Sequence, residues 1–257
     1  MAVVETSLDA GILTITLNNP PRNTLSMAVL KTLFELERQL YEPEVQAIIF
    51  TGTGRIFCAG ADVDEMPSIP NKEALDMFSV KGHAFFETLA NFPKPIIAAI
   101  NGTCLGGGLE LALVCHFRII SDRGLVGLPE IELGLIPGLG GTQRLTRLIG
   151  EGPALELICT GATINPDEAL AKGIVHKVVP RKDVYPEAVA LARKLMSKDR
   201  IALQRAIRAV KAANQVPLSA GLELERMYFS ELWQKVFKSA DAAGGASPSA
   251  PRSDTGV

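Results

Sequence analysis

Residues 96–113 read IIAAINGTCLGGGLELAL, an apolar and glycine-rich stretch whose single acidic residue is Glu110. A second stretch of the same kind, GLPEIELGLIPGLGGTQR, spans residues 127–144 and contains Glu130 and Glu132. A carboxylate flanked by leucines is costly to bury unless it is paired, protonated or used in chemistry. Two such carboxylates beside permissive, glycine-rich backbone indicate an acid/base site with an oxyanion pocket.

The residues around these stretches alternate between strand and helix patterns. Apolar runs at 45–50 and 96–100 predict buried strands, and the segments 3–8 and 11–17 predict a hairpin. Helical spacing follows a predicted N-cap at Ser26 and recurs over about 72–91 and 106–115. We therefore expect an α/β fold in which a unit of strands and a helix repeats loosely.

The pattern changes after about residue 181, where three helical stretches follow with no strand signal between them. We expect a core domain over residues 1–182 and a helical region over 183–239 that serves packing or oligomerisation. Residues 240–257 are rich in Ala, Gly, Ser and Pro, which predicts a disordered tail.

Composition excludes several classes of protein. The 257 residues carry 26 Lys and Arg against 28 Asp and Glu, so no excess of positive charge favours a nucleic-acid partner. No apolar run reaches the ~20 residues that a membrane span needs, and no secretory signal is visible. We expect a protein without a membrane partner, located in the cytoplasm or in an organelle matrix.

The cysteines and histidines do not form a metal or disulfide pattern. The cysteines lie in apolar runs without a CxxC pair, which predicts buried free thiols: Cys58, Cys104, Cys115 and Cys159. The three histidines are far apart in the chain, and His116 ends an apolar helix pattern, so we expect a structural role for it and no metal site.

The glycine clusters do not match the common nucleotide loops. The triplet at 106–108 is not followed by Lys-Ser/Thr and does not give GxGxxG, and the cluster at 138–141 fails the same test. One interpretation is a tight turn required by packing; the other is a backbone that approaches a ligand and aims an N–H at it. A second small-residue turn, FCAGAD at 57–62, could supply a second N–H to the same oxygen.

These motifs together resemble one known group of proteins. The segments are NNPP (18–21), FCAGAD (57–62), LGGGLELA (105–112), GLPE (127–130), GLIPG (134–138) and GGTQR (140–144). With them the chain resembles the crotonase, or enoyl-CoA hydratase/isomerase, superfamily over about residues 3–235. The resemblance implies a spiral of ββα units followed by a helical trimerisation region, and hence a homotrimer or homohexamer.

The resemblance also implies a set of site residues. The backbone N–H groups of Ala61 and Gly107 would bind the thioester oxygen of an acyl-CoA substrate. Glu110 would orient and deprotonate a water, and Glu130 would exchange the proton at Cα. Glu132 would be structural or lie at the rim. No cofactor is expected, because coenzyme A is part of the substrate.

The number of glutamates favours one activity within the superfamily. Hydratases resemble this chain in having glutamates at the positions of both Glu110 and Glu130. Δ3,Δ2-isomerases usually keep only the carboxylate at the position of Glu130, because shuttling one proton needs one base. We expect syn addition of water to a 2-trans-enoyl-CoA in fatty-acid or branched-chain/aromatic acyl-CoA breakdown. The alternatives are an isomerase or another acyl-CoA lyase and, more remotely, a non-catalytic binding protein.

Most of the expected substrate contacts lie in or just after the FCAGAD turn at 57–62, and one lies in the glycine triplet at 106–108. They are Ala61, Asp62, Val63, Asp64 and Gly107. This turn is acidic where many hydratases carry a basic residue for the phosphates of coenzyme A. Arg22 and Arg55 are therefore the candidates for phosphate contacts.

Overall fold

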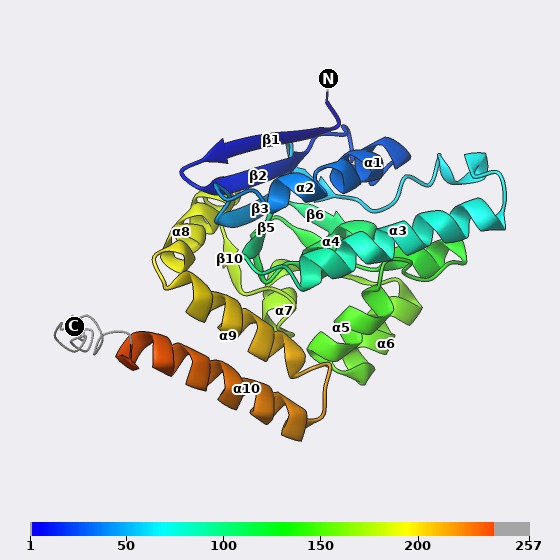
Figure 1. The fold of residues 1–257 in the computed structure, drawn as a ribbon. Helices are drawn as coiled ribbons and strands as arrows, with labels where there is room; N and C mark the ends of the chain where they lie inside the picture. The colour runs from blue at the N-terminus through cyan, green and yellow to red at the C-terminus, as the bar shows by residue number, and fades with distance from the viewer. Residues whose placement is uncertain (1, 239–257) are drawn as a thin grey trace. The chain divides into compact units, whose positions relative to one another are not determined.

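The structure is a computed structural model that describes residues 2–238 (Figure 1). Contacts divide the chain into two compact units, residues 1–198 and 199–257. Helix α8 (Val184–Met196), which the sequence-based boundary after residue 182 assigns to the helical region, groups with the first unit. It does so because it packs on strands β3, β5 and β7. The predicted tail at 240–257 lies outside the described residues.

The first unit contains a large, mainly parallel sheet in the order β1-β2-β3-β5-β7-β10. Only β1 and β2 pair in the antiparallel sense, and the remaining neighbours are parallel. The strands are β1 (Val4–Asp9), β2 (Ile12–Leu17), β3 (Ala47–Gly52), β5 (Ile96–Ile100), β7 (Phe117–Ser121) and β10 (Lys177–Val179).

A smaller sheet has the order β4-β6-β8-β9, in which β4, β6 and β8 are parallel and β9 is antiparallel to β8. Its strands are β4 (Ile56–Cys58), β6 (Thr103–Leu105), β8 (Leu125–Gly127) and β9 (Thr163–Ile164). Strands this short leave no periodic pattern in the sequence, and sequence analysis did not predict them.

The chain winds between the two sheets in repeated ββα turns. Strand β3 of the large sheet leads to β4 of the small sheet and then to α3 (Lys72–Ala90). Strands β5 and β6 lead in the same way to α4 (Gly107–Val114), and β7 and β8 lead to η2 (Pro129–Leu133) and α5 (Gly141–Ile149). This topology confirms the expected spiral of ββα units. As a result β4 and β6 end side by side, followed by the two glycine turns.

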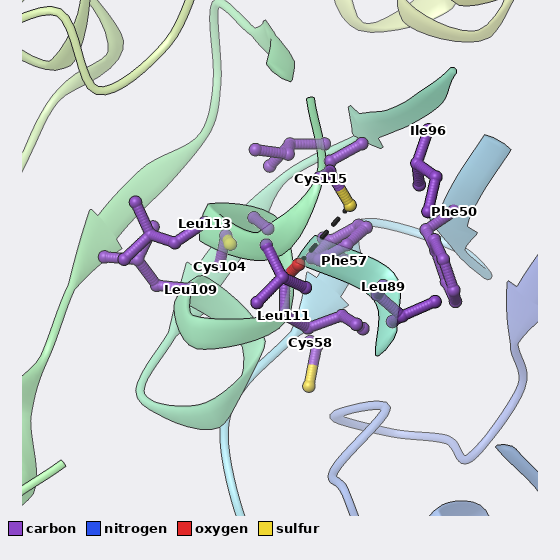
Figure 2. Close-up of a cluster of buried hydrophobic side chains, with 14 of the residues drawn as sticks. Phe50, Phe57, Cys58, Leu89, Ile96, Cys104, Leu109, Leu111, Leu113 and Cys115 are labelled. Atoms are coloured by element: carbon purple, nitrogen blue, oxygen red, sulfur yellow. Dashed lines mark hydrogen bonds between the residues drawn. The ribbon is translucent and has the colours of Figure 1, made fainter. Parts of the chain in front are cut away.

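Both faces of the large sheet are covered, which explains the continuous apolar runs of its strands. Alternate residues of β3 enter different clusters: Ile48 and Phe50 face the main core, whereas Ala47 and Ile49 join Ala188 of α8. Helix α4 lies inside the main core, where all eight of its residues are buried. Figure 2 shows the leucines of α4 among side chains from neighbouring strands and α3.

The N-terminal predictions are confirmed. The hairpin turns at Ala10 and Gly11, which both have positive φ angles. Ser26 is the N-cap of α1 (Met27–Glu35), and its side chain accepts a hydrogen bond from the Val29 N–H. A short helix, α2 (Glu37–Leu40), follows. The other short elements of this unit are η1 (Met66–Ser68), α6 (Glu151–Thr160), α7 (Pro166–Ala171) and η3 (Arg181–Asp183).

The cysteine prediction is confirmed at three positions and wrong at one. Cys58, Cys104 and Cys115 are buried free thiols, whereas Cys159 is exposed. Cys159 lies near the end of α6, a helix that buries only Ala154 and Leu157, so an apolar residue beyond that stripe stays at the surface.

The second unit is described over residues 199–238. It consists of α9 (Arg200–Ala212), α10 (Leu218–Trp233) and the short η4 (Gln234–Lys238). Arg205 joins the two long helices through a two-pronged ion pair with Glu231, at 3.0 and 2.7 Å. No residue of α9 or α10 is buried. Within residues 2–238, none of the helices has the length and apolar character needed to cross a membrane.

Candidate active site

Two glycine turns meet where β4 and β6 end. Gly60 (φ 101°) follows β4, and Gly106 (φ 51°) follows β6, so both turns use backbone conformations that favour glycine. A Cβ placed on Gly107 would lie 3.6 Å from the Ala61 nitrogen, and one on Gly60 would lie 3.7 Å from the Gly107 nitrogen. The structure therefore brings Ala61 and Gly107 together, as the sequence predicts.

Helix α4 begins at Gly107, so the N–H of this residue has no carbonyl partner within the helix. The positive end of the helix dipole lies at the same point, which favours a partial negative charge on a bound oxygen. Gly108 packs directly on β4: a Cβ there would lie 2.4 Å from the Cys58 carbonyl oxygen. The glycine triplet thus agrees with both interpretations left open by the sequence: Gly108 makes a tight packing contact, and Gly107 has an N–H without a partner inside the helix.

Glu110 lies one turn into α4 and is only 2% exposed. Its Oε1 accepts hydrogen bonds from the backbone N–H groups of Leu139 and Gly141, each at 2.7 Å. Burial raises the pKa of Glu110 from 4.5 to about 7, against the lowering effect of those two N–H groups. The charge of Glu130 raises this pKa further, and that of Arg144 lowers it. The carboxyl group is thus set to titrate near neutral pH.

Glu130 approaches the same glycine turn from η2. A Cβ placed on Gly106 would lie 3.0 Å from Glu130 Oε1, so the carboxylate lies against the turn that precedes Gly107. Its Oε2 is buried and has no hydrogen-bond partner among the described residues. Burial raises the pKa of Glu130 above its ordinary value. The charge of Glu130 is also one of the smaller causes that raise the pKa of Glu110, so the two carboxyl groups belong to one site.

Glu132 points elsewhere, although it lies only two residues from Glu130. Residues 129–133 form a 3₁₀ helix. In a helix of three residues per turn, positions i and i+2 diverge. The Glu132 Oε1 lies 2.9 Å from where a Cβ of Gly161 would be, at the end of α6. Glu132 is exposed, and its assignment as structural or rim stays a prediction.

The acidic turn after Ala61 is tied to the start of α1. Asp62 accepts hydrogen bonds from the Thr24 hydroxyl at 2.8 Å and from the Asp64 N–H at 3.2 Å. Glu65 accepts one from the Met27 N–H at 2.7 Å. The carboxylates of Asp62 and Glu65 therefore stabilise the loop that carries Ala61.

The remaining predicted substrate contacts lie around this turn. Ala61, Val63 and Asp64 are exposed, so a ligand can reach them. The carbonyl of Arg22 accepts a hydrogen bond from the Ala59 N–H at 3.1 Å, which places the Arg22 backbone beside the turn, and its side chain is exposed. Arg55 is also exposed. The assignment of phosphate contacts to Arg22 and Arg55 stays a prediction.

Sequence analysis missed the groups that hold Glu110. The N–H donors of Leu139 and Gly141 belong to the backbone of the 137–141 turn, and Arg144 donates to the Leu139 carbonyl at 3.0 Å. The only signal for this turn is the cluster Gly138-Leu139-Gly140-Gly141. It was considered as a nucleotide loop, not as a support for a carboxylate.

His116 is structural, as expected. Its Nδ1 accepts a hydrogen bond from the Ile96 N–H at 3.0 Å, at the first residue of β5. Across residues 2–238, no group of three or more His, Cys, Asp or Glu side chains is arranged to hold a metal ion.

The buried carboxyl group of Glu110 and the half-buried one of Glu130 lie near two neighbouring glycine turns, an arrangement suited to acid/base chemistry, and comparison with known proteins identifies the family. The enoyl-CoA hydratase/isomerase family model matches residues 7–243. The chain belongs to this family and is an enzyme of the hydratase/isomerase type.

Individual relatives are similar over most of their length. A probable enoyl-CoA hydratase of Bacillus subtilis is 39% identical over 95% of this chain and 94% of its own. A crotonyl-CoA hydratase of Syntrophomonas wolfei is 40% identical over 72% of this chain and 71% of its own. The crystal structure of an enoyl-CoA hydratase from Bacillus anthracis superposes with a TM-score of 0.85 at 36% identity, covering 96% and 98% of the two chains.

Proposed function

We propose that this chain is an enoyl-CoA hydratase, a hydro-lyase that adds water to a 2-trans-enoyl-CoA to give a 3-hydroxyacyl-CoA. The observation that carries the proposal is that Glu110, one turn into the helix that begins at Gly107, shares a site with Glu130, which lies against the Gly106 turn. Adding water across a double bond requires one group to take a proton from water and another to give a proton to carbon. Glu110, whose pKa burial raises to about 7, and Glu130, whose pKa burial also raises, are suited to these two tasks.

The thioester oxygen of the substrate accepts hydrogen bonds from the N–H groups of Ala61 and Gly107. These donors stabilise the negative charge that develops on this oxygen when the double bond is attacked. Removing one such donor typically costs ~10²–10³ in rate, so the pair is a major source of catalysis. Ala61 is exposed, which leaves its turn open to an incoming thioester.

Glu110 acts as the base. Its Oε1 is occupied by the Leu139 and Gly141 N–H groups, which leaves Oε2 to hold the reacting water. The water oxygen bonds to Cβ and its proton moves to Glu110, while the π electrons shift toward the thioester oxygen. The resulting enolate takes a proton at Cα from Glu130. The water thus supplies the hydroxyl, and transfer of a proton from Glu110 back to Glu130, directly or through solvent, resets the pair.

Glutamine variants test these roles. Glu110→Gln and Glu130→Gln each keep the side-chain shape but can no longer exchange a proton, so we expect crotonyl-CoA hydration to fall by at least ~10². Glu132→Gln, a matched change two residues from Glu130, should hydrate crotonyl-CoA at close to the normal rate. The decrease in crotonyl-CoA absorbance measures the hydration rate of all three variants. Near-normal turnover by Glu110→Gln or Glu130→Gln would contradict the catalytic roles assigned to these two residues.

One observation favours an isomerase as the second candidate. The buried Oε2 of Glu130 has no partner among the described residues, and one base in this position is enough to take a proton from C2 of a 3-enoyl-CoA and return it to C4 while the double bond moves from C3=C4 to C2=C3. Assaying 3-enoyl-CoA beside 2-enoyl-CoA separates the two activities. Isomerisation without hydration would replace the proposed function with this one.

We also propose that the enzyme works as a homotrimer or homohexamer in the cytoplasm, without a cofactor. The support for assembly is the exposure of large apolar side chains on α9 and α10, including Val210 (74%), Leu218 (78%) and Phe229 (69%). Exposed apolar side chains in this number are typical of a surface that another chain covers.

A further inference from the structure

The turn that holds Glu110 is itself fixed by an ion pair between two other helices. Arg144 of α5 donates from Nη1 to the Leu139 carbonyl oxygen at 3.0 Å and from Nη2 to Glu87 Oε2 of α3 at 3.0 Å. The Leu139 residue therefore receives a hydrogen bond at its carbonyl and gives one, through its N–H, to Glu110. Arg144 acts on Glu110 through a single intervening residue.

The fit around the guanidinium is close. A Cβ on Gly140 would lie 2.0 Å from Arg144 Nη1, so a side chain there would displace the guanidinium, and the φ of 102° at Gly140 favours glycine. A Cβ on Gly82 of α3 would lie 2.6 Å from a methyl carbon of Leu139. The turn is thus packed between α3 and the Arg144 side chain, which is 22% exposed.

We propose that Arg144, anchored by Glu87, is a positioning residue that keeps the Leu139 and Gly141 N–H groups on Glu110 and so keeps this carboxylate ionised and oriented for the water. The inference rests on the proposed function of Glu110 as the base. Arg144 does not touch the reacting atoms in this account. Its effect is exerted through the 139–141 backbone and through its charge.

The charges around Glu110 agree with this role. The pKa of Glu110, raised mainly by burial, is lowered by the Gly141 and Leu139 N–H groups and by the charge of Arg144. The carboxyl group of Glu130 on η2 acts in the opposite direction. From α3, Glu87 faces Arg144 and not Glu110. Loss of the guanidinium removes one lowering charge and loosens two lowering hydrogen bonds.

Arg144→Met tests the inference, with Arg147→Met as the matched control. Arg147 lies one turn further along α5, is exposed, and hydrogen-bonds through its side chain to Gln143 within residues 2–238. In Arg144→Met the acid limb of the pH profile of kcat/KM for crotonyl-CoA should move to higher pH by about one unit. At pH values below this limb, kcat/KM should be ~10-fold lower than that of the wild type. The Arg147→Met profile should match the wild type, and the conservative Arg144→Lys should recover part of the shift because it keeps the charge.

A direct titration separates this inference from the proposed function. The carboxylic acid infrared band of Glu110 is obtained by subtracting the spectrum of the matching Glu110→Gln protein, with and without Arg144→Met. We expect the protonated band to persist to higher pH in the Arg144→Met background. If it titrates unchanged, or if Arg144→Met lowers kcat/KM equally at every pH, Arg144 is merely structural and the inference fails. An absence of hydration by the wild type would overturn the proposed function, while the infrared titration would still test Arg144.

Discussion

At the residue scale, the informative property of Glu110 is that its folded environment opposes its charge. The side chain is almost wholly buried, and the two N–H groups on its Oε1 only partly offset the loss of water. A carboxyl group kept solely for structure would be better placed in a less buried position or replaced by an amide. Its retention in this form agrees with a use in proton transfer.

This environment predicts a pH-dependent cost in stability. The folded pKa of about 7 lies above the ordinary 4.5, so the folded state binds the proton more tightly and loses stability as the pH rises between these values. The full cost, about 3 kcal/mol, is reached above pH 7. Glu110→Gln keeps an acceptor for both N–H groups and carries no charge. We expect it to be more stable than the wild type by ~1–3 kcal/mol at pH 8 and nearly equal to it below pH 5.

Thermal or urea unfolding of the wild type and Glu110→Gln at the two pH values measures this difference. Glu132→Gln, at an exposed position, is the control and should change stability little at either pH. A Glu110→Gln protein that is less stable than the wild type at pH 8 would show that the ionised carboxylate is favourable in its site, contrary to the account.

At the scale of elements, the site depends on how closely α4 packs against the end of β4. Gly108 is the contact point, since a Cβ there would meet the Cys58 carbonyl oxygen at 2.4 Å and the Cys58 Cβ at 2.7 Å. Neither of these is the end of a flexible side chain, so a larger residue must move the helix or the strand. Either movement separates the Ala61 turn from the start of α4.

Gly108→Ala should therefore reduce both stability and catalysis. We expect a loss of about 1–3 kcal/mol in the free energy of unfolding, together with a lower kcat for hydration. Gly152→Ala is the matched control, because Gly152 lies in α6 with nothing within 4 Å of its Cβ position. That change should be neutral or slightly stabilising, by about 0.4–1 kcal/mol. A Gly108→Ala enzyme with wild-type stability and rate would refute the close-packing argument.

The elements that the sequence predicts well are those with long, periodic patterns. The strand at 96–100 is observed with the predicted bounds, and a helix at 184–196 is the first of the helical stretches predicted after residue 181, because burial on both faces, or along one stripe, leaves a clear apolar signal. The three-residue strands β4, β6 and β8 are too short for that signal. The meeting of Ala61 with Gly107 came from motif resemblance, whereas the support of Glu110 by backbone N–H groups has no side-chain signature to detect.

At the scale of the whole molecule, the chain combines the ββα spiral with a helical unit that buries little of its own apolar surface. We expect the protein in solution to have three or six times the 27.5 kDa mass of the chain. Light scattering measures that mass. Phe229→Asp should shift the population toward smaller species, because it places a charge on an exposed apolar position, whereas Ser230→Asp, on the adjacent exposed residue, should not. A monomeric wild type would contradict the proposed assembly.

The central claim is that Glu110 and Glu130 act on one water at one face of a thioester held by Ala61 and Gly107. Glu130 lies against the Gly106 turn and its charge acts on the carboxyl group of Glu110, so in this account the hydroxyl and the Cα proton are delivered from the same side. The most direct test is hydration of crotonyl-CoA in D₂O, with the configuration of the Cα deuterium read by NMR early in the reaction. The account predicts one diastereomer, with deuterium and hydroxyl added syn. Anti addition, or a mixture of both diastereomers, would contradict it.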